Sequence, residues 1–144
     1  MRVYADSSFL VSCYLTDANT GQAKAFLLEH GAPLPFTYLH GLEVRNAFQL
    51  GVFRRLISVD EAREAGATLD ADLRSGRLVR TSVKWPAVLR AASRVSVQHS
   101  ATTGARSVDI LHVAAARALR CKSLASFDVR QRDVAAVAGL ASSF

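Results

Sequence analysis

Short apolar stretches alternate along the chain with longer segments in which apolar residues recur every three or four positions. The second spacing places apolar side chains on one face of a helix, whereas a short apolar run between turn residues is typical of a strand. The short stretches predict β-strands over residues 2–5, 34–37, 78–81, 123–126 and 140–142. The longer segments predict helices over residues 9–15, 20–29, 39–55, 58–75, 86–98, 109–119 and from 128 onward.

Strands separated by helices predict an α/β fold with a parallel sheet covered on both faces, because a parallel strand is reached only through a crossover. We expect one domain over residues 1–144, since the sequence has no internal repeat, low-complexity segment or linker. In open sheets of this kind, ligands bind beyond the carboxyl ends of the strands. Polar residues that directly follow strands are therefore the first candidates for a functional site.

Four acidic residues fall at such positions or in apolar surroundings. Asp6 directly follows the first predicted strand, and Asp128 follows the strand over residues 123–126. Asp109 begins the helix that leads into that same strand. Glu43 lies among apolar neighbours inside a helix, where a lone carboxylate is expensive. Each acid also has a structural explanation as a helix cap or a solvated side chain, so it is their joint placement that predicts an acidic pocket.

The four carboxylates predict a site for a divalent cation. Two carboxylates about 5 Å apart repel by about 3 kcal/mol at an effective dielectric constant of ~20, unless a cation lies between them. Mg²⁺ binds one or a few carboxylates together with water, and it can acidify that water and stabilise charge on a phosphate. We expect Asp6 and Asp109 to bind the metal, with Glu43 and Asp128 in support. His112 is an alternative ligand, although a partly buried helix histidine is the simpler interpretation.

The chain is strongly basic, with 18 Lys and Arg against 12 Asp and Glu, a net charge of +6 and a pI near 10.0. Nearly all of these cations are arginines, whose planar group binds phosphate through two parallel hydrogen bonds. The charge predicts a polyanionic partner, nucleic acid above all, but it does not distinguish binding from cleavage.

Four segments resemble the pattern of one known family, and together they span essentially the whole chain. They are Val3-Tyr4-Ala5-Asp6-Ser7-Ser8, Leu42-Glu43-Val44-Arg45-Asn46-Ala47, Ser107-Val108-Asp109-Ile110-Leu111-His112-Val113-Ala114-Ala115-Ala116 and Ser126-Phe127-Asp128. The first is similar to a strand that ends in Asp followed by a small hydroxyl residue, and the third to an Asp followed by an alanine-rich helix. The chain thus resembles the PIN-domain family and, within it, the VapC-type toxins of bacterial toxin–antitoxin pairs.

The resemblance implies a three-layer α/β/α sandwich with a mostly parallel sheet of four or five strands. It also implies binding of Mg²⁺ or Mn²⁺ and endonuclease action on RNA, with a metal-activated water attacking phosphorus. The implied catalytic acids are Asp6, Glu43, Asp109 and Asp128. Asp133 is an alternative to Asp128 as the fourth acid, and Ser7 is a candidate for orienting a metal ligand or water.

The resemblance implies three partners, namely an RNA substrate, a cognate antitoxin and a second copy of the chain. Candidate contacts to the RNA backbone are Arg45, Arg130 and Arg132. Apolar residues of one predicted helix are candidates for docking a protein partner, although core packing explains them equally well. These are Phe48, Val52 and Phe53.

We expect a cytoplasmic protein without a membrane partner. No apolar run approaches the ~18–20 residues that cross a bilayer, and Asp6 interrupts any apolar leader. Cys13 and Cys121 have no metal-binding spacing, and we expect both to be small buried apolar residues.

Two other classes of protein remain open at this point. A phosphatase or receiver-like phosphoryl-transfer domain also places Asp at strand ends, but the phosphatase pattern requires an acid where Ser8 stands. A late lysine of the receiver type would follow a strand, whereas Lys122 precedes one. The second class is a non-catalytic module that binds nucleic acid or a partner, in which the acids are purely structural.

Overall fold

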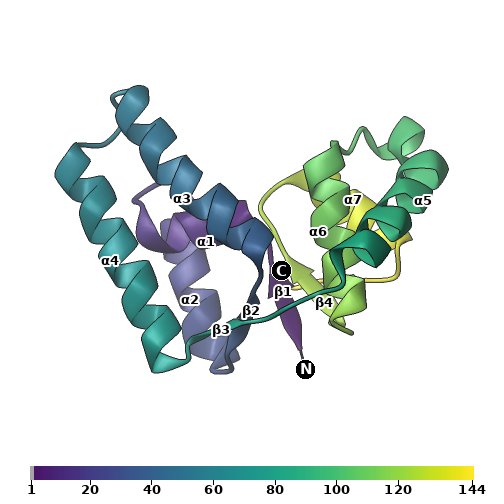
Figure 1. Cartoon of the computed structure of the whole chain (residues 1–144), viewed down its shortest axis with the longest axis horizontal. Helices are drawn as coiled ribbons and strands as arrows, with labels where there is room; N and C mark the ends of the chain where they lie inside the picture. The colour runs from purple at the N-terminus through teal and green to yellow at the C-terminus, as the bar shows by residue number, and fades with distance from the viewer. Residues whose placement is uncertain (1) are drawn as a thin grey trace. The chain divides into compact units, whose positions relative to one another are not determined.

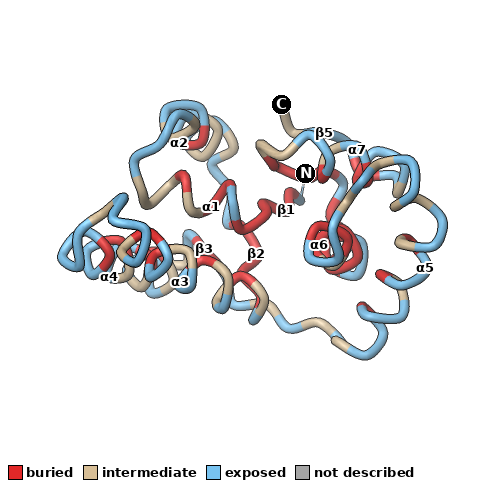
Figure 2. The backbone as a smooth tube through the Cα atoms, turned by 90° about the horizontal axis from the view of Figure 1, so that it is seen from above, coloured by how far each residue is buried: buried red, intermediate tan, exposed pale blue. Residues whose placement is uncertain are grey.

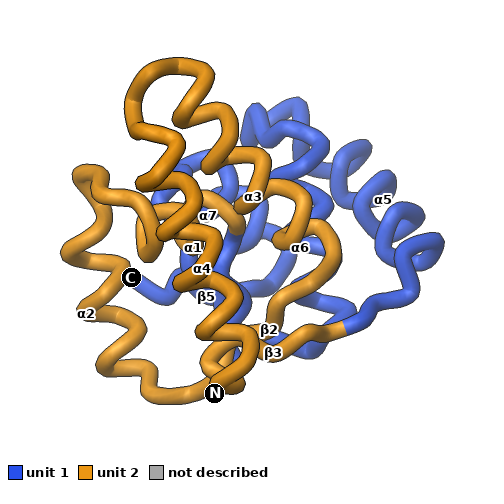
Figure 3. Tube along the Cα trace, turned by 60° about the vertical axis from the view of Figure 1, so that its left-hand side comes forward, with its two compact units in different colours: residues 1–6, 82–144 blue, residues 7–81 orange. Residues whose placement is uncertain are grey.

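The computed structural model describes residues 2–144 and divides into two compact units (Figure 3). Unit 1 consists of residues 1–6 and 82–144, and unit 2 of residues 7–81. Unit 1 is therefore discontinuous in sequence, because a short N-terminal segment joins the C-terminal half of the chain. One domain over residues 1–144 stays a prediction.

Unit 1 contains a parallel sheet of three strands in the order β1-β4-β5, of which Figure 1 labels β1 and β4. Its strands are β1 (Val3–Ala5), β4 (Ser123–Ala125) and β5 (Ala141–Ser142). Its helices are α5 (Trp85–Thr103), α6 (Ser107–Ala118) and α7 (Val129–Val137). Val3 lies opposite Ser123 in the ladder between β1 and β4, so the two strands end level with each other.

Helix α6 forms the centre of the core of unit 1. Its residues from Ile110 to Ala116 are almost continuously buried, and Figure 2 shows this buried stretch in red. The run of three alanines at the end of this stretch lets neighbouring elements approach closely, and α5 packs against α6 through Val88 and Val95. The His112 ring is hydrogen-bonded through Nδ1 to the Tyr4 hydroxyl at 2.9 Å, which places this histidine in the core.

Unit 2 contains a parallel pair of strands, with Leu34 opposite Leu78, and four helices. These elements are α1 (Ser7–Tyr14), α2 (Thr20–His30), β2 (Leu34–Phe36), α3 (Tyr38–Phe53), α4 (Val59–Ser75) and β3 (Leu78–Arg80). Helix α4 begins with a capping box, in which the Ser58 hydroxyl accepts from Glu61 N at 3.1 Å. Phe48 is buried and contacts the Tyr14 ring, whereas Phe53 is 82% exposed.

The α/β class and the parallel pairing are confirmed, but the five strands are divided between a sheet of three and a sheet of two. The single sandwich of four or five strands stays a prediction. Helix α5 also continues to Thr103, past its predicted end at residue 98. It ends where Gly104 adopts a left-handed conformation, with φ of +66°, and donates its N–H to Ser100 O. Within residues 2–144, no helix is long and apolar enough to cross a membrane.

Enlarging a buried alanine of α6 should destabilise the protein, because the helix packs there without spare volume. Ala115 is fully buried, and Ala115→Leu is expected to lower the free energy of unfolding by about 1–3 kcal/mol. Ala118 is exposed on the same helix, and Ala118→Leu serves as the matched control with little expected effect. Urea denaturation of the two variants measures the difference, and equal stabilities would contradict the tight packing of α6.

Candidate acidic site

Asp6 lies at the carboxyl end of β1, where the parallel ladder with β4 fixes its backbone. Its N–H donates to Ala125 O at 3.0 Å, and its carboxylate Oδ2 accepts a hydrogen bond of 2.5 Å from the Ser126 hydroxyl. Both side chains are buried, with Asp6 only 1% exposed. Two neighbouring parallel strands therefore end in a carboxylate and a hydroxyl that are joined to each other.

Asp128 is connected to the same hydroxyl, because its N–H donates to Ser126 Oγ at 3.1 Å. Its own carboxylate caps helix α7, with Oδ1 accepting from Arg130 N at 2.8 Å and from Gln131 N at 3.4 Å. The Asp128 side chain remains 25% exposed. It is therefore a helix cap and a member of the acidic site at once.

Asp109 is held by Arg106, the residue that precedes α6. Its Oδ2 accepts from Arg106 N at 2.9 Å and from Arg106 Nε at 3.1 Å, and the Asp109 residue is 5% exposed. Arg106 Nη2 also reaches Asp128 Oδ2 at 3.4 Å. One guanidinium thus joins two acids and offsets the repulsion that the sequence predicted between carboxylates of this site.

Ser126 and Arg106 are the two members of this network that sequence reasoning missed. The sequence does contain a signal for Ser126, since this residue ends a predicted strand two residues before Asp128. Arg106 lies three residues before Asp109, in the spacing of a capping box, but arginine is not a usual N-cap residue. Unit 1 thus contains one acidic network, made of Asp6, Ser126, Asp128, Arg106 and Asp109.

Glu43 lies in unit 2 and has a different partner. Its Oε2 accepts a hydrogen bond of 2.8 Å from the hydroxyl of Ser7, the first residue of α1. Glu43 is partly buried beside the fully buried Val44, so its interpretation as a plain solvated side chain does not hold. The predicted acid Glu43 and the predicted auxiliary residue Ser7 are therefore brought together.

The remaining predicted residues lie outside the acidic network or at its edge. Asp133 is exposed on α7, and no ion pair involves it within residues 2–144. Arg45 forms an ion pair of 2.6 Å with Asp70 in unit 2. Arg130 lies 3.8 Å from Asp128, while Arg132 is partly buried and pairs with no carboxylate in the part of the chain that is described.

The acids of unit 1 fit a magnesium ion in donor chemistry. Across residues 2–144, no group of three or more His, Cys, Asp and Glu side chains lies together in a way that holds a metal. Mg²⁺ needs only one or two protein carboxylates, because it keeps several waters. Asp109 and Asp128 already share one positive group, the Arg106 guanidinium, so a metal ion at this position would have to share or displace these contacts.

The two cysteines are poorly suited to nucleophilic chemistry. Burial raises the pKa of Cys13 to about 12, and Asp72 adds to the effect. Burial also raises the pKa of Cys121 above its ordinary value. Both thiols are therefore protonated at neutral pH, and the reactive form of cysteine is the thiolate.

Removing the charge of Asp109 should destabilise the metal-free protein, because Arg106 is then deprived of its buried partner. Asp109→Asn is expected to lower the free energy of unfolding in EDTA by about 1 kcal/mol, a modest value because the guanidinium is largely exposed. Asp133→Asn is the matched control, since it removes the same charge from an exposed position. Thermal melts in EDTA compare the two, and a higher melting temperature for Asp109→Asn would show that repulsion dominates instead.

The acidic network provides hard oxygen donors at the carboxyl ends of two parallel strands, where α/β proteins bind their ligands. Carboxylates in such a place can hold a cation, and a cation can in turn bind and polarise a phosphate. No protein-family model matches the chain, and no curated protein matches it.

Proposed function

We propose that the protein is a magnesium-dependent endoribonuclease that hydrolyses phosphodiester bonds in RNA, with Mn²⁺ as an alternative metal. The observation that carries this function is the network that joins Asp6, Asp109 and Asp128 in unit 1 through Ser126 and Arg106. The single α/β/α sandwich implied by the PIN-domain resemblance belongs to this same proposal.

Asp6 and Asp109 are the proposed metal ligands, because both carboxylates are buried and held in place. Ser126 fixes the Asp6 carboxylate by donating to Oδ2, and Arg106 fixes Asp109 by donating to its two oxygens. When bound, Mg²⁺ would supply a more acidic water and stabilise negative charge on the phosphate. Asp128 is the proposed supporting acid within unit 1, and Glu43 keeps the supporting role that the resemblance to the PIN-domain family implies.

The distribution of charge supports a nucleic-acid substrate. Unit 1 contains ten Lys and Arg residues and four Asp, whereas unit 2 contains eight cationic and eight acidic residues. The entire formal net charge of +6 therefore lies on the unit that contains the acidic network. A strongly basic surface attracts a polyanion and raises its local concentration.

Substitution of either proposed metal ligand should abolish RNA cleavage. Asp6→Asn and Asp109→Asn are each expected to reduce the rate with Mg²⁺ by about a hundredfold or more, because stabilisation of charge in the transition state is removed. Asp133→Asn, which removes an exposed carboxylate from the same unit, should cleave at the normal rate. Incubation of fluorescent RNAs with each protein, followed by gel electrophoresis, measures the rates.

Two results would contradict the nuclease mechanism. Undiminished cleavage in EDTA would exclude a metal-dependent reaction. RNA binding without cleavage, unaffected by chelator and by Asp6→Asn, would identify a non-catalytic binding module in which the three aspartates serve only as structural partners of Ser126, Arg106 and α7.

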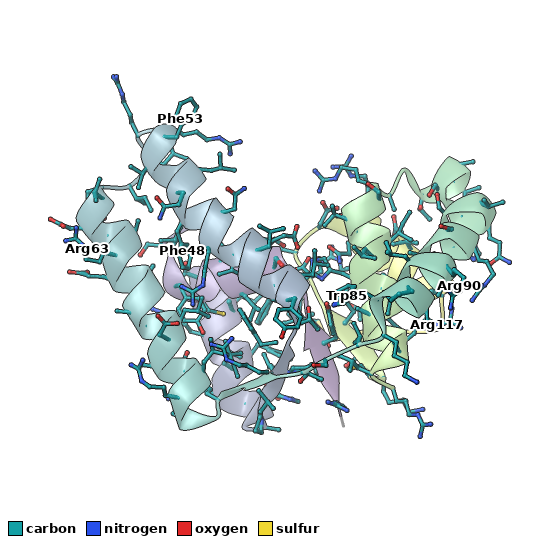
Figure 4. The ribbon with its side chains drawn as sticks, viewed as in Figure 1. Phe48, Phe53, Arg63, Trp85, Arg90 and Arg117 are labelled. Atoms are coloured by element: carbon teal, nitrogen blue, oxygen red, sulfur yellow. The ribbon has the colours of Figure 1, made fainter. Side chains whose placement is uncertain are left out.

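We further propose that the protein is the toxin of a toxin–antitoxin pair. Helix α3 leaves apolar side chains unburied, with Leu42 70% and Phe53 82% exposed, and Figure 4 shows Phe53 at the end of this helix. Such residues suit a protein partner, either a cognate antitoxin or a second copy of the chain. Of the predicted docking residues, Phe48 belongs to the core and Phe53 remains available.

Expression of the protein alone should arrest bacterial growth if RNA cleavage is its cellular activity. The Asp109→Asn protein should be harmless at the same expression level, while Asp133→Asn should arrest growth like the unchanged protein. Growth curves after induction, with protein amounts compared on immunoblots, provide the measurement. Equal growth inhibition by the unchanged protein and Asp109→Asn would contradict the toxin role.

A further inference from the structure

A basic groove lies in unit 1, formed by residues 82–98 and 114–120. Its volume is about 880 Å³, and it is lined by residues from the segment before α5, from α5 and from the end of α6. Four cationic residues line it, and no carboxylate does. These four are Lys84, Arg94, Arg117 and Arg120.

The cations of the basic groove are not neutralised by the protein. All four are exposed, and none forms an ion pair with a carboxylate within residues 2–144. The surrounding sequence explains why, since no acidic residue occurs between Asp72 and Asp109, while seven Lys and Arg residues do. Figure 4 labels Arg117, the groove cation on α6, together with Arg90 of α5, which does not line the groove.

A concentration of like charges is unfavourable for the folded chain by itself, so the groove favours an anionic ligand. Three of its four cations are arginines, which can grip successive phosphates through paired hydrogen bonds. Between them the groove has an apolar floor that includes Val88, Val95 and Ala114. Charged walls around an apolar floor suit an extended strand that is charged along its backbone.

Helix α6 connects the basic groove to the acidic network within unit 1. Asp109 lies in its first turn and Arg117 in its last, eight residues later. At 1.5 Å per residue this separation is about 12 Å along the helix axis, a distance that a few nucleotides of single strand can span. One RNA strand can therefore lie in the groove and reach the acids.

We propose that the basic groove binds the phosphodiester backbone of an RNA strand to one side of the bond that is cleaved. This assignment rests on the proposed ribonuclease function, which supplies the identity of the anion. It adds Lys84, Arg94, Arg117 and Arg120 as substrate-positioning residues, distinct from Arg45, Arg130 and Arg132. These residues contact phosphates rather than bases, so they set affinity and not sequence preference.

The test measures RNA binding in EDTA, where no cleavage occurs. A fluorescent single-stranded RNA is titrated with protein, and anisotropy gives Kd at several salt concentrations. The triple variant Arg94→Gln, Arg117→Gln and Arg120→Gln should bind more weakly, and the slope of log Kd against log salt should fall by about 2, or ~0.7 for each phosphate that is no longer neutralised. The matched control, Arg54→Gln, Arg55→Gln and Arg74→Gln, removes the same charge from unit 2 and should leave the slope unchanged.

Several outcomes would overturn the groove as an RNA site. One is an unchanged slope for the triple variant, and another is an equally weakened control, which would indicate net charge alone. In a third outcome, polyglutamate binds the unchanged protein but not the triple variant, while RNA binds neither protein. This result would identify an acidic protein as the partner of the groove. If the triple variant does not fold by circular dichroism, Arg117→Gln alone should lower the slope by ~0.7.

Failure of the proposed nuclease function is distinguishable from failure of the groove. The binding assay in EDTA tests the groove arginines, whereas cleavage with Mg²⁺ tests Asp6, so the two assays report on different residues. If the groove arginines are needed for RNA binding but the protein never cleaves RNA, the proposed nuclease function is refuted and the groove remains an RNA-binding site. If cleavage depends on Asp6 but not on the groove arginines, the proposed nuclease function stands and the groove is refuted as an RNA-binding site.

Discussion

The parallel pairing of β1 with β4 is the interaction on which the candidate site depends. These strands have only three residues each, yet their register sets Ala5 opposite Ala125 and so places Asp6 beside Ser126. The remaining members of the acidic network follow from it. Ser126 receives the N–H of Asp128, Asp128 caps α7, and Arg106 connects Asp128 to Asp109. An error in this one register would remove Asp6 from the network.

Local signals predicted most elements well because they depend on neighbours in sequence. The capping box at Ser58 and the N-cap at Asp128 are each decided within a few residues, and both are present. The division of five strands into two sheets was not predictable, because strand pairing is a long-range choice between similar three-residue segments. The extension of α5 was missed because Ser and Thr are neutral between helix and loop, and only Gly104 decides the end.

The site was predictable in its acids but not in what holds them. Positions at strand ends pointed to Asp6 and Asp128, and the start of a helix pointed to Asp109, whereas the contacts of Arg106 depend on a side-chain conformation that no periodicity encodes. The same carboxylates also cap helices and pair with Arg106, so structural and functional explanations coexist. A cation at Asp109 and Asp128 would have to compete with the Arg106 guanidinium for their oxygens.

The discontinuous composition of unit 1 has a consequence for the order of events during synthesis. The hydrogen bond between Asp6 and Ser126 joins residues 120 positions apart. At a synthesis rate of roughly 5–20 residues per second, about 6–24 s pass between the addition of Asp6 and the addition of Ser126. Loop closure over this length is also a slow, non-local step of folding. The acidic network is therefore complete only after the ribosome has added Asp128, although its first member, Asp6, is among the first residues made.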